Sequence, residues 1–129
     1  MIRAFVLVLG VQSALAPAAR ADDADPWFGR DKFAHFVVAT SLATETYVIA
    51  VNNTGARWHA IAIGAGVTLA VGAGKEGWDA LGHGNASWRD FAWDAIGAAA
   101  GLGVAWGLDL LLRGVDDRHP LFRAPALAF

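Results

Sequence analysis

Three long apolar runs, separated by short polar segments, make up most of the chain after residue 30. They cover residues 31–51, 58–74 and 88–112, and none shows the alternation of apolar and polar positions expected of a half-buried strand. The sequence Asn-Asn-Thr-Gly at 52–55 is a strong turn signal, and a polar glycine-containing segment precedes the third run. The pattern therefore predicts an all-α fold, a small bundle of three helices.

A helix start signal precedes the third run. Ser87 is followed three residues later by Asp90, a spacing that resembles a capping box, although Asp is a shorter partner than Glu. Within this run Gly97-x-x-x-Gly101, and then glycines at 103 and 107, have the spacing that lets helices approach closely in a membrane. The third helix is predicted to begin near Trp88 and to present a smooth face to a neighbour.

The first residues have the features of a secretory signal. Arg3 gives a positive start, residues 4–15 form the apolar region, and Ala19-Arg20-Ala21 fits the small-x-small rule for cleavage before Asp22. An uncleaved first membrane helix is the alternative, because residues 2–19 could just span a bilayer. The predicted organisation is a signal peptide at 1–21, a linker at 22–30, a helical domain at 31–112 and a C-terminal tail at 113–129.

The composition indicates a membrane setting. Hydrophobic residues make up 56% of the chain and charged residues 17%, against about 45–50% and about 25% in soluble domains. The bundle is therefore predicted to be membrane-embedded or membrane-associated, with a tightly packed soluble periplasmic bundle as the alternative. The net charge of −2 argues against nucleic-acid binding, and no nucleotide-binding motif occurs. Membrane lipids or envelope proteins are the expected partners.

Charged residues gather where the three predicted helices should meet. Short connections make the helices alternate in direction, so the start of the first, the end of the second and the start of the third share one end of the bundle. A signal at the N-terminus places that end on the periplasmic side. The candidate polar residues are Asp31, Lys32, His35, Lys75, Glu76, Asp79, Arg89, Asp90 and Asp94.

The two acids of the third helix require a counter-charge. Asp90 and Asp94 are four residues apart, on the stripe that continues into Gly97 and Gly101, and like charges at this spacing repel. A lysine or arginine of the group could neutralise them. A divalent cation could do the same, and the candidate ligands are His35, Asp79 and Asp94. A structural hydrogen bond from His35 to a nearby acid is the simpler alternative, and no other cofactor is expected.

Three motifs in order carry a family resemblance. They are Asp-Lys-Phe-Ala-His-Phe at 31–36, Gly-Lys-Glu-Gly-Trp-Asp at 74–79, and Ala-Ser-Trp-Arg-Asp-Phe-Ala-Trp-Asp-Ala-Ile-Gly at 86–97. Together they resemble the YfiM-like family of small bacterial envelope proteins and, more distantly, the VanZ-like membrane proteins. The resemblance implies an exported envelope protein, often a lipoprotein, with no established activity. This chain has no cysteine and so cannot be lipidated in that way.

The sequence favours two functions over the others, which include transport or lipid binding through Glu45. The favoured one is a small cell-envelope protein without catalytic activity, whose charged residues form a structural or interaction network. The alternative is a membrane-adjacent metal-binding protein or hydrolase acting on an envelope or lipid headgroup substrate. The common motifs of serine hydrolases and zinc proteases are absent from the sequence, and nothing in it specifies a substrate.

Overall fold

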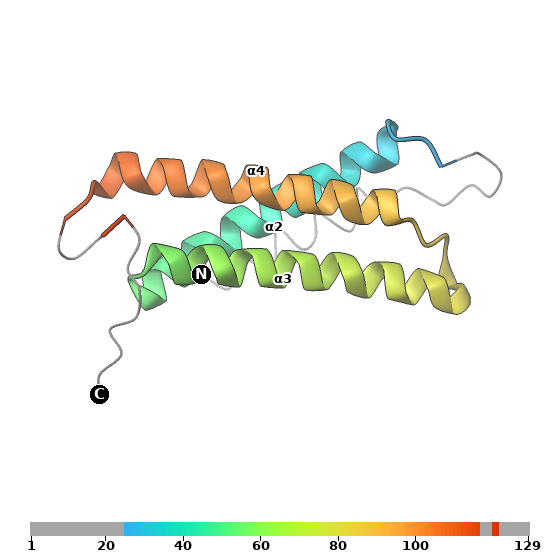
Figure 1. Ribbon diagram of the computed structural model, residues 1–129, viewed down its shortest axis with the longest axis horizontal. Helices are drawn as coiled ribbons and strands as arrows, with labels where there is room; N and C mark the ends of the chain where they lie inside the picture. Colours follow the sequence, from blue (N-terminus) through green and yellow to red (C-terminus); the bar gives the residue numbers. More distant parts are fainter. Residues whose placement is uncertain (1–24, 117–119, 122–129) are drawn as a thin grey trace, which may run out of the picture.

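The computed structural model describes residues 25–116, 120 and 121, and within them it shows an all-α bundle without strands. Helix α2 covers Arg30–Thr54, α3 covers Arg57–Trp78, and α4 covers Trp88–Arg113. A short π-helical segment, η1 (Asp79–His83), follows α3 directly (Figure 1). The predicted bundle of three helices is confirmed. The predicted signal peptide, the first residues of the predicted linker and most of the predicted tail lie outside the described residues.

The helix ends follow the local sequence signals. Gly55 ends α2 in the left-handed conformation (φ 66°), and its N–H donates to the carbonyl of Val51 at 2.9 Å. Ser87 caps α4, because its hydroxyl accepts a hydrogen bond from the backbone N–H of Asp90 at 3.2 Å. Gly114 ends α4 with φ 67°, another backbone conformation that favours glycine. The Asn-Asn-Thr-Gly turn at 52–55 and the Ser87 cap, both identified in the sequence, therefore lie at connections between helices.

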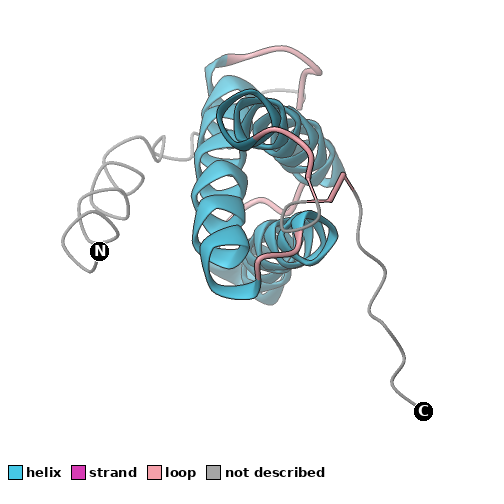
Figure 2. Ribbon diagram, turned by 90° about the vertical axis from the view of Figure 1, so that its left-hand side faces the viewer, coloured by secondary structure: helices cyan, strands magenta, loops and turns pink. Residues whose placement is uncertain are grey.

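The helix directions bring three helix ends together. In Figure 1 the start of α2, the end of α3 and the start of α4 lie at the right-hand end of the bundle. Figure 2 shows the bundle from the opposite end, with each helix beside the other two, and all three pairs make contacts. The convergence of charged helix ends that the sequence predicted is thus present in the structure.

Helices α2 and α4 make the closest approach in the bundle. A Cβ atom at Gly101 would lie 2.3 Å from the carbonyl oxygen of Thr40, and one at Gly97 would lie 2.5 Å from that of Phe36. In return, the hydroxyls of Thr40 and Thr44 donate to the carbonyls of Gly97 and Gly101, each at 3.1 Å. The predicted small-residue contact is confirmed at this pair. It is wrong for the glycines at 103 and 107, where a Cβ atom would meet nothing within 4 Å.

The interior of the bundle is built from small side chains. Its core contains Tyr47, Val51 and Leu102, and the other members are alanines at 43, 50, 60, 98 and 105. The largest wholly buried side chains are those of Arg57, Tyr47, Lys32 and Thr68. Many large apolar side chains instead face outward, and Leu111 and Leu112 are each 83% exposed. The core is thus apolar but made of small side chains, most of the largest buried side chains are polar, and many large apolar side chains face outward, unlike in most water-soluble proteins.

Replacing Gly101 by alanine tests the α2–α4 contact. The new methyl group would collide with the Thr40 backbone, so we expect Gly101→Ala to lower the stability of the bundle by about 1–3 kcal/mol, as overpacking does. The control is Gly103→Ala on the open face of the same helix, which should be neutral or stabilising because alanine favours helix by about 1 kcal/mol. Thermal unfolding followed by circular dichroism measures both. Equal effects of the two substitutions would contradict the contact.

Candidate functional site

The candidate site is a group of charged side chains at the shared end of the helices, called here the polar cluster. It draws residues from the start of α2, the end of α3, the first residue of η1 and the start of α4, and from the segment that precedes α2. Its members are Asp25, Asp31, Lys32, His35, Lys75, Glu76, Asp79, Arg89, Asp90 and Asp94.

Lys32 occupies the centre of the polar cluster. It lies in the first turn of α2, and its side chain is only 2% exposed. Its ammonium group donates hydrogen bonds to carboxylate oxygens of Asp25, Asp90 and Asp31, the last at 3.0 Å. A buried charge is tolerated only when it is paired and hydrogen-bonded in this way. One cation therefore joins the segment before α2 to the start of α4.

His35 lies one turn further along α2 and contacts both acids of α4. Its Nδ1 is 2.9 Å from Oδ1 of Asp94, and its Nε2 is 3.5 Å from Oδ2 of Asp90. All three side chains are largely buried. The repulsion expected between Asp90 and Asp94 is thus offset by an imidazole and by the lysines, as the sequence analysis anticipated.

Lys75, near the end of α3, contacts three acids, of which Asp90 is also shared with Lys32 and His35. Its ammonium group lies 2.8 Å from Glu76, 2.9 Å from Asp79 and 3.3 Å from Asp90. Partial burial by itself would lower the Lys75 pKa, but the hydrogen bonds to Glu76 and Asp79 outweigh this and raise the pKa. The side chain is 40% exposed, so Lys75 is the lysine of the cluster that solvent reaches.

The cap of α4 is tied into the same cluster. The Ser87 hydroxyl accepts from the Asp90 backbone N–H, as the sequence predicted. In a capping box the Asp90 carboxylate would accept from the Ser87 backbone N–H, but here a different residue does so. The Ser87 N–H donates to Oε2 of Glu76 at 2.5 Å, while the Asp90 carboxylate binds the two lysines. A glutamate at the end of α3 therefore completes the cap and joins the two helices across the loop between them.

Asp25 joins the cluster although the sequence analysis placed it in a linker. One of its carboxylate oxygens accepts from Lys32, and the other accepts from the Ser87 hydroxyl at 2.5 Å. Hydrogen bonds from Lys32 and then from Ser87 hold the pKa of Asp25 below its usual value. Arg89 donates to the Asp25 carbonyl at 2.8 Å and stacks over Trp27 and Trp88, with 5.5 Å to each ring centroid. No spacing pattern in the sequence reveals the contacts of Asp25 with Ser87 and Arg89, which lie more than 60 residues away.

A second buried ion pair lies at the opposite end of the bundle and is called here the distal ion pair. Arg57, at the start of α3, places its Nε 2.5 Å from Oδ2 of Asp109 in α4. Arg113 also contacts Asp109, at 3.2 Å, and the Tyr47 hydroxyl lies 3.4 Å from it. The sequence analysis does not single out this pair. An acid inside a long apolar run was the available signal.

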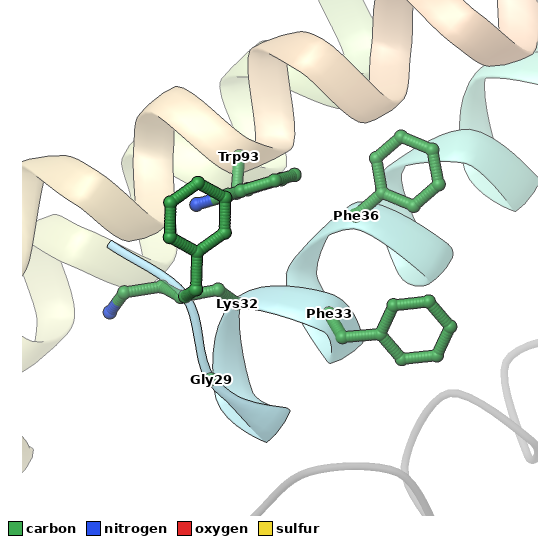
Figure 3. A pocket seen from close by; sticks show the side chains of 6 residues that line it. Gly29, Lys32, Phe33, Phe36 and Trp93 are labelled. Atoms are coloured by element: carbon green, nitrogen blue, oxygen red, sulfur yellow. The ribbon is translucent and has the colours of Figure 1, made fainter. Parts of the chain in front are cut away.

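Two hollows flank the polar cluster. The first, of about 320 Å³, is lined by the aromatic rings of Phe28, Phe33, Phe36 and Trp93 and by the stem of Lys32 (Figure 3). In that view the Lys32 ammonium points away from the Phe33 and Phe36 rings, so the hollow is apolar. The second, of about 370 Å³, lies between α3 and α4 and includes Glu76 and Ser87.

Two groups of acids and histidine within the described residues have a spacing that could hold a metal ion. In each group the ligand atoms lie within 4.8 Å of one another. The first group is Asp25, Asp31 and Asp90, and the Lys32 ammonium already binds all three carboxylates. The second is His35, Glu76 and Asp90. Of the ligands proposed from sequence, Asp94 binds the other ring nitrogen of His35 and Asp79 pairs with Lys75, so the geometry favours Glu76 and Asp90 instead.

Comparison with protein-family models, with curated proteins and with solved structures finds no match for this chain. By length and composition, α2 and α4 are apolar enough to cross a membrane, and only 33% of the apolar window of each is buried within the bundle. The helical bundle and its two apolar helices are thus shown by the structure itself.

The lowered Asp25 pKa makes a pH-dependent prediction. A carboxylate whose folded pKa lies below its unfolded value of 3.8 contributes stability that is present above that value and is lost as the pH falls through the folded pKa. We therefore expect Asp25→Asn to destabilise the protein at pH 7. The difference from wild type should shrink as the pH falls below about 4. Chemical unfolding at a series of pH values measures it, and a difference that does not change with pH would contradict the assignment.

Proposed function

We propose that this protein is a small membrane-embedded component of the cell envelope. Its polar cluster is a structural network that fixes the positions of the helices at the periplasmic end, where lipids or envelope proteins are bound. The supporting observation is that long charged side chains are buried and paired inside the bundle while many large apolar side chains face outward.

The outer surface of the bundle suits a lipid environment. Its exposed large apolar side chains come from all three long helices, and extensive apolar surface is typical of proteins that contact a membrane or a partner. Prominent examples are Ile49, Ile63, Val67, Val71, Ile96, Val104, Leu108, Leu111 and Leu112. Ionisable residues inside membrane helices typically face the bundle interior and pair with one another, as Lys32 and Arg57 do.

The helix lengths and the tryptophans fit the same setting. Helices α2 and α4 have 25 and 26 residues, and about 20 apolar residues are needed to cross a hydrocarbon core. Exposed tryptophans lie near both ends of the bundle, with Trp27, Trp78 and Trp88 near the polar cluster and Trp58 at the start of α3. Amphipathic aromatic rings at both ends are typical of the two membrane interfaces.

The pairing inside the polar cluster favours a structural role. Asp90 is shared by Lys32, His35 and Lys75, and each of these three side chains also contacts at least one other carboxylate. These bonds link all three long helices. A network of this kind selects one arrangement of the helices, because any other leaves buried charges without partners.

Removing the central cation tests this role. Lys32→Met would leave the carboxylates around it without their shared partner, so we expect a loss of about 3–5 kcal/mol in stability. Asp94→Ala should act in the same direction by removing the partner of His35. Lys75→Met is the matched comparison and should cost less, since that lysine is 40% exposed and Asp90 keeps Lys32 and His35 as partners. Unfolding midpoints and cellular abundance measure the effects, and an unchanged Lys32→Met protein would contradict the proposal.

The position in the envelope can be tested with single cysteines, because the native chain has none. We expect the mature protein to begin at Asp22 and to stay with membranes through a high-salt wash. A cysteine at the exposed position Ala86, beside the polar cluster, should react with a membrane-impermeant reagent in intact cells. The control is a cysteine at the exposed position Asn53, at the other end of the bundle, which should be protected.

Release of the protein by salt would contradict embedding in the membrane. Reaction at position 53 with protection at position 86 would reverse the orientation. Both results are independent of the stability test of the polar cluster, so location and network can fail separately.

A further inference from the structure

We propose that the part of the polar cluster where His35, Glu76 and Asp90 meet is a binding site for one divalent transition-metal ion of the zinc type. The ligands are Nε2 of His35 and one carboxylate oxygen from each acid, and Lys75 is the counter-ion that the metal displaces. The site goes beyond the structural role proposed above and does not depend on the membrane setting.

The donor set suits a borderline-soft cation. One nitrogen and two oxygens come from three different helices, and their ligand atoms all lie within 4.8 Å. Two ligands bound tetrahedrally to Zn²⁺ at about 2.0–2.1 Å lie about 3.4 Å apart. The distance of 3.5 Å between His35 Nε2 and Asp90 Oδ2 already has this value. Imidazole with carboxylate favours zinc and similar ions over calcium and magnesium, which prefer oxygen alone.

Asp94 gives His35 the orientation of a metal ligand. Metal-binding histidines almost always donate the N–H of their other ring nitrogen to a carboxylate or carbonyl, which fixes the tautomer and the ring direction. Asp94 lies 2.9 Å from Nδ1 and accepts such a bond. When Nε2 carries no proton, its lone pair faces a carboxylate oxygen of Asp90 at 3.5 Å, and two acceptors in that position need a cation between them. A proton on Nε2 is the competing occupant, and the experiment below separates the two.

The position of the Lys75 ammonium shows that this place binds a cation, and Lys75 can move away from it. Its ammonium contacts Glu76 and Asp90, two of the three ligands, and it contacts Asp79 at 2.9 Å as well. Because the side chain is 40% exposed, it can turn toward Asp79 and solvent while a metal takes over its other two acids. The buried Lys32 lacks this freedom, which is why the group around it is not the site.

Direct titration of the purified, chelator-treated protein with zinc chloride tests the proposal. We expect one ion per chain. Glu76→Gln, which keeps the side-chain shape, should weaken binding at least about 10-fold, and Asp94→Asn should weaken it about 10–100-fold as the loss of an orienting carboxylate does. Lys75→Met should strengthen binding by about 10-fold or more, because the competing ammonium is gone. His83→Ala is the control, since that exposed histidine contacts Trp78 and not the polar cluster.

The zinc titration tests the metal site, and its result does not depend on the structural role of the polar cluster. No stoichiometric zinc binding by wild type or by Lys75→Met would overturn the proposal and leave a proton as the occupant of Nε2. Binding that survives Glu76→Gln but falls with His83→Ala would also overturn it. Circular dichroism of each variant confirms folding, and X-ray absorption of the zinc-loaded protein should show a single imidazole among oxygen ligands. Loss of stability in Lys32→Met with no zinc binding would support the structural network alone.

Discussion

The pairing of the buried Lys32 ammonium with three carboxylates is the constraint on which the arrangement of this bundle depends. Asp25 precedes α2, Asp31 belongs to its first turn, and Asp90 belongs to the first turn of α4, so one ammonium group joins three parts of the chain. Burying a charge costs several kcal/mol in lost hydration, and only partners of this kind offset that cost. The start of α2 and the start of α4 must therefore lie together for Lys32 to keep its partners. His35 and Lys75 contact Asp90 too, so the end of α3 must also lie beside them.

The close contact of α2 and α4 makes this pairing geometrically feasible. Gly97 and Gly101 have no side chain, so the two backbones approach until the Thr40 and Thr44 hydroxyls reach the carbonyls of the opposite helix. If the two helices lay further apart, the short side chain of Asp94 would not reach His35. The glycines along α4 and the charged residues at the helix ends therefore depend on each other. A substitution that separates the helices would also weaken the polar cluster.

The sequence was sufficient for the fold and for the location of the site, but not for its pairings. Apolar runs and turn residues predict the helices within a few residues of their observed ends, and helix order alone places His35, Glu76 and Asp90 together. Which atoms meet depends on helix rotation and on side-chain conformation, which hydrophobic periodicity does not encode at this precision. For that reason Asp25 was missed, Asp79 was chosen where Asp90 lies closer, and Arg57 was not paired with Asp109.

The alanine-rich core has a further consequence for the entropy of folding. Alanine and glycine lose no side-chain rotamer freedom when they are buried, whereas long cationic side chains lose up to about 2 kcal/mol each. In this bundle the long side chains that become fixed, Lys32 and Arg57, lie in the polar cluster and in the distal ion pair. The ordering of side chains is thus concentrated at the two ends. Between them the helices are held by close backbone approach, two threonine hydrogen bonds and a core made mostly of alanine, so little side-chain entropy is lost there.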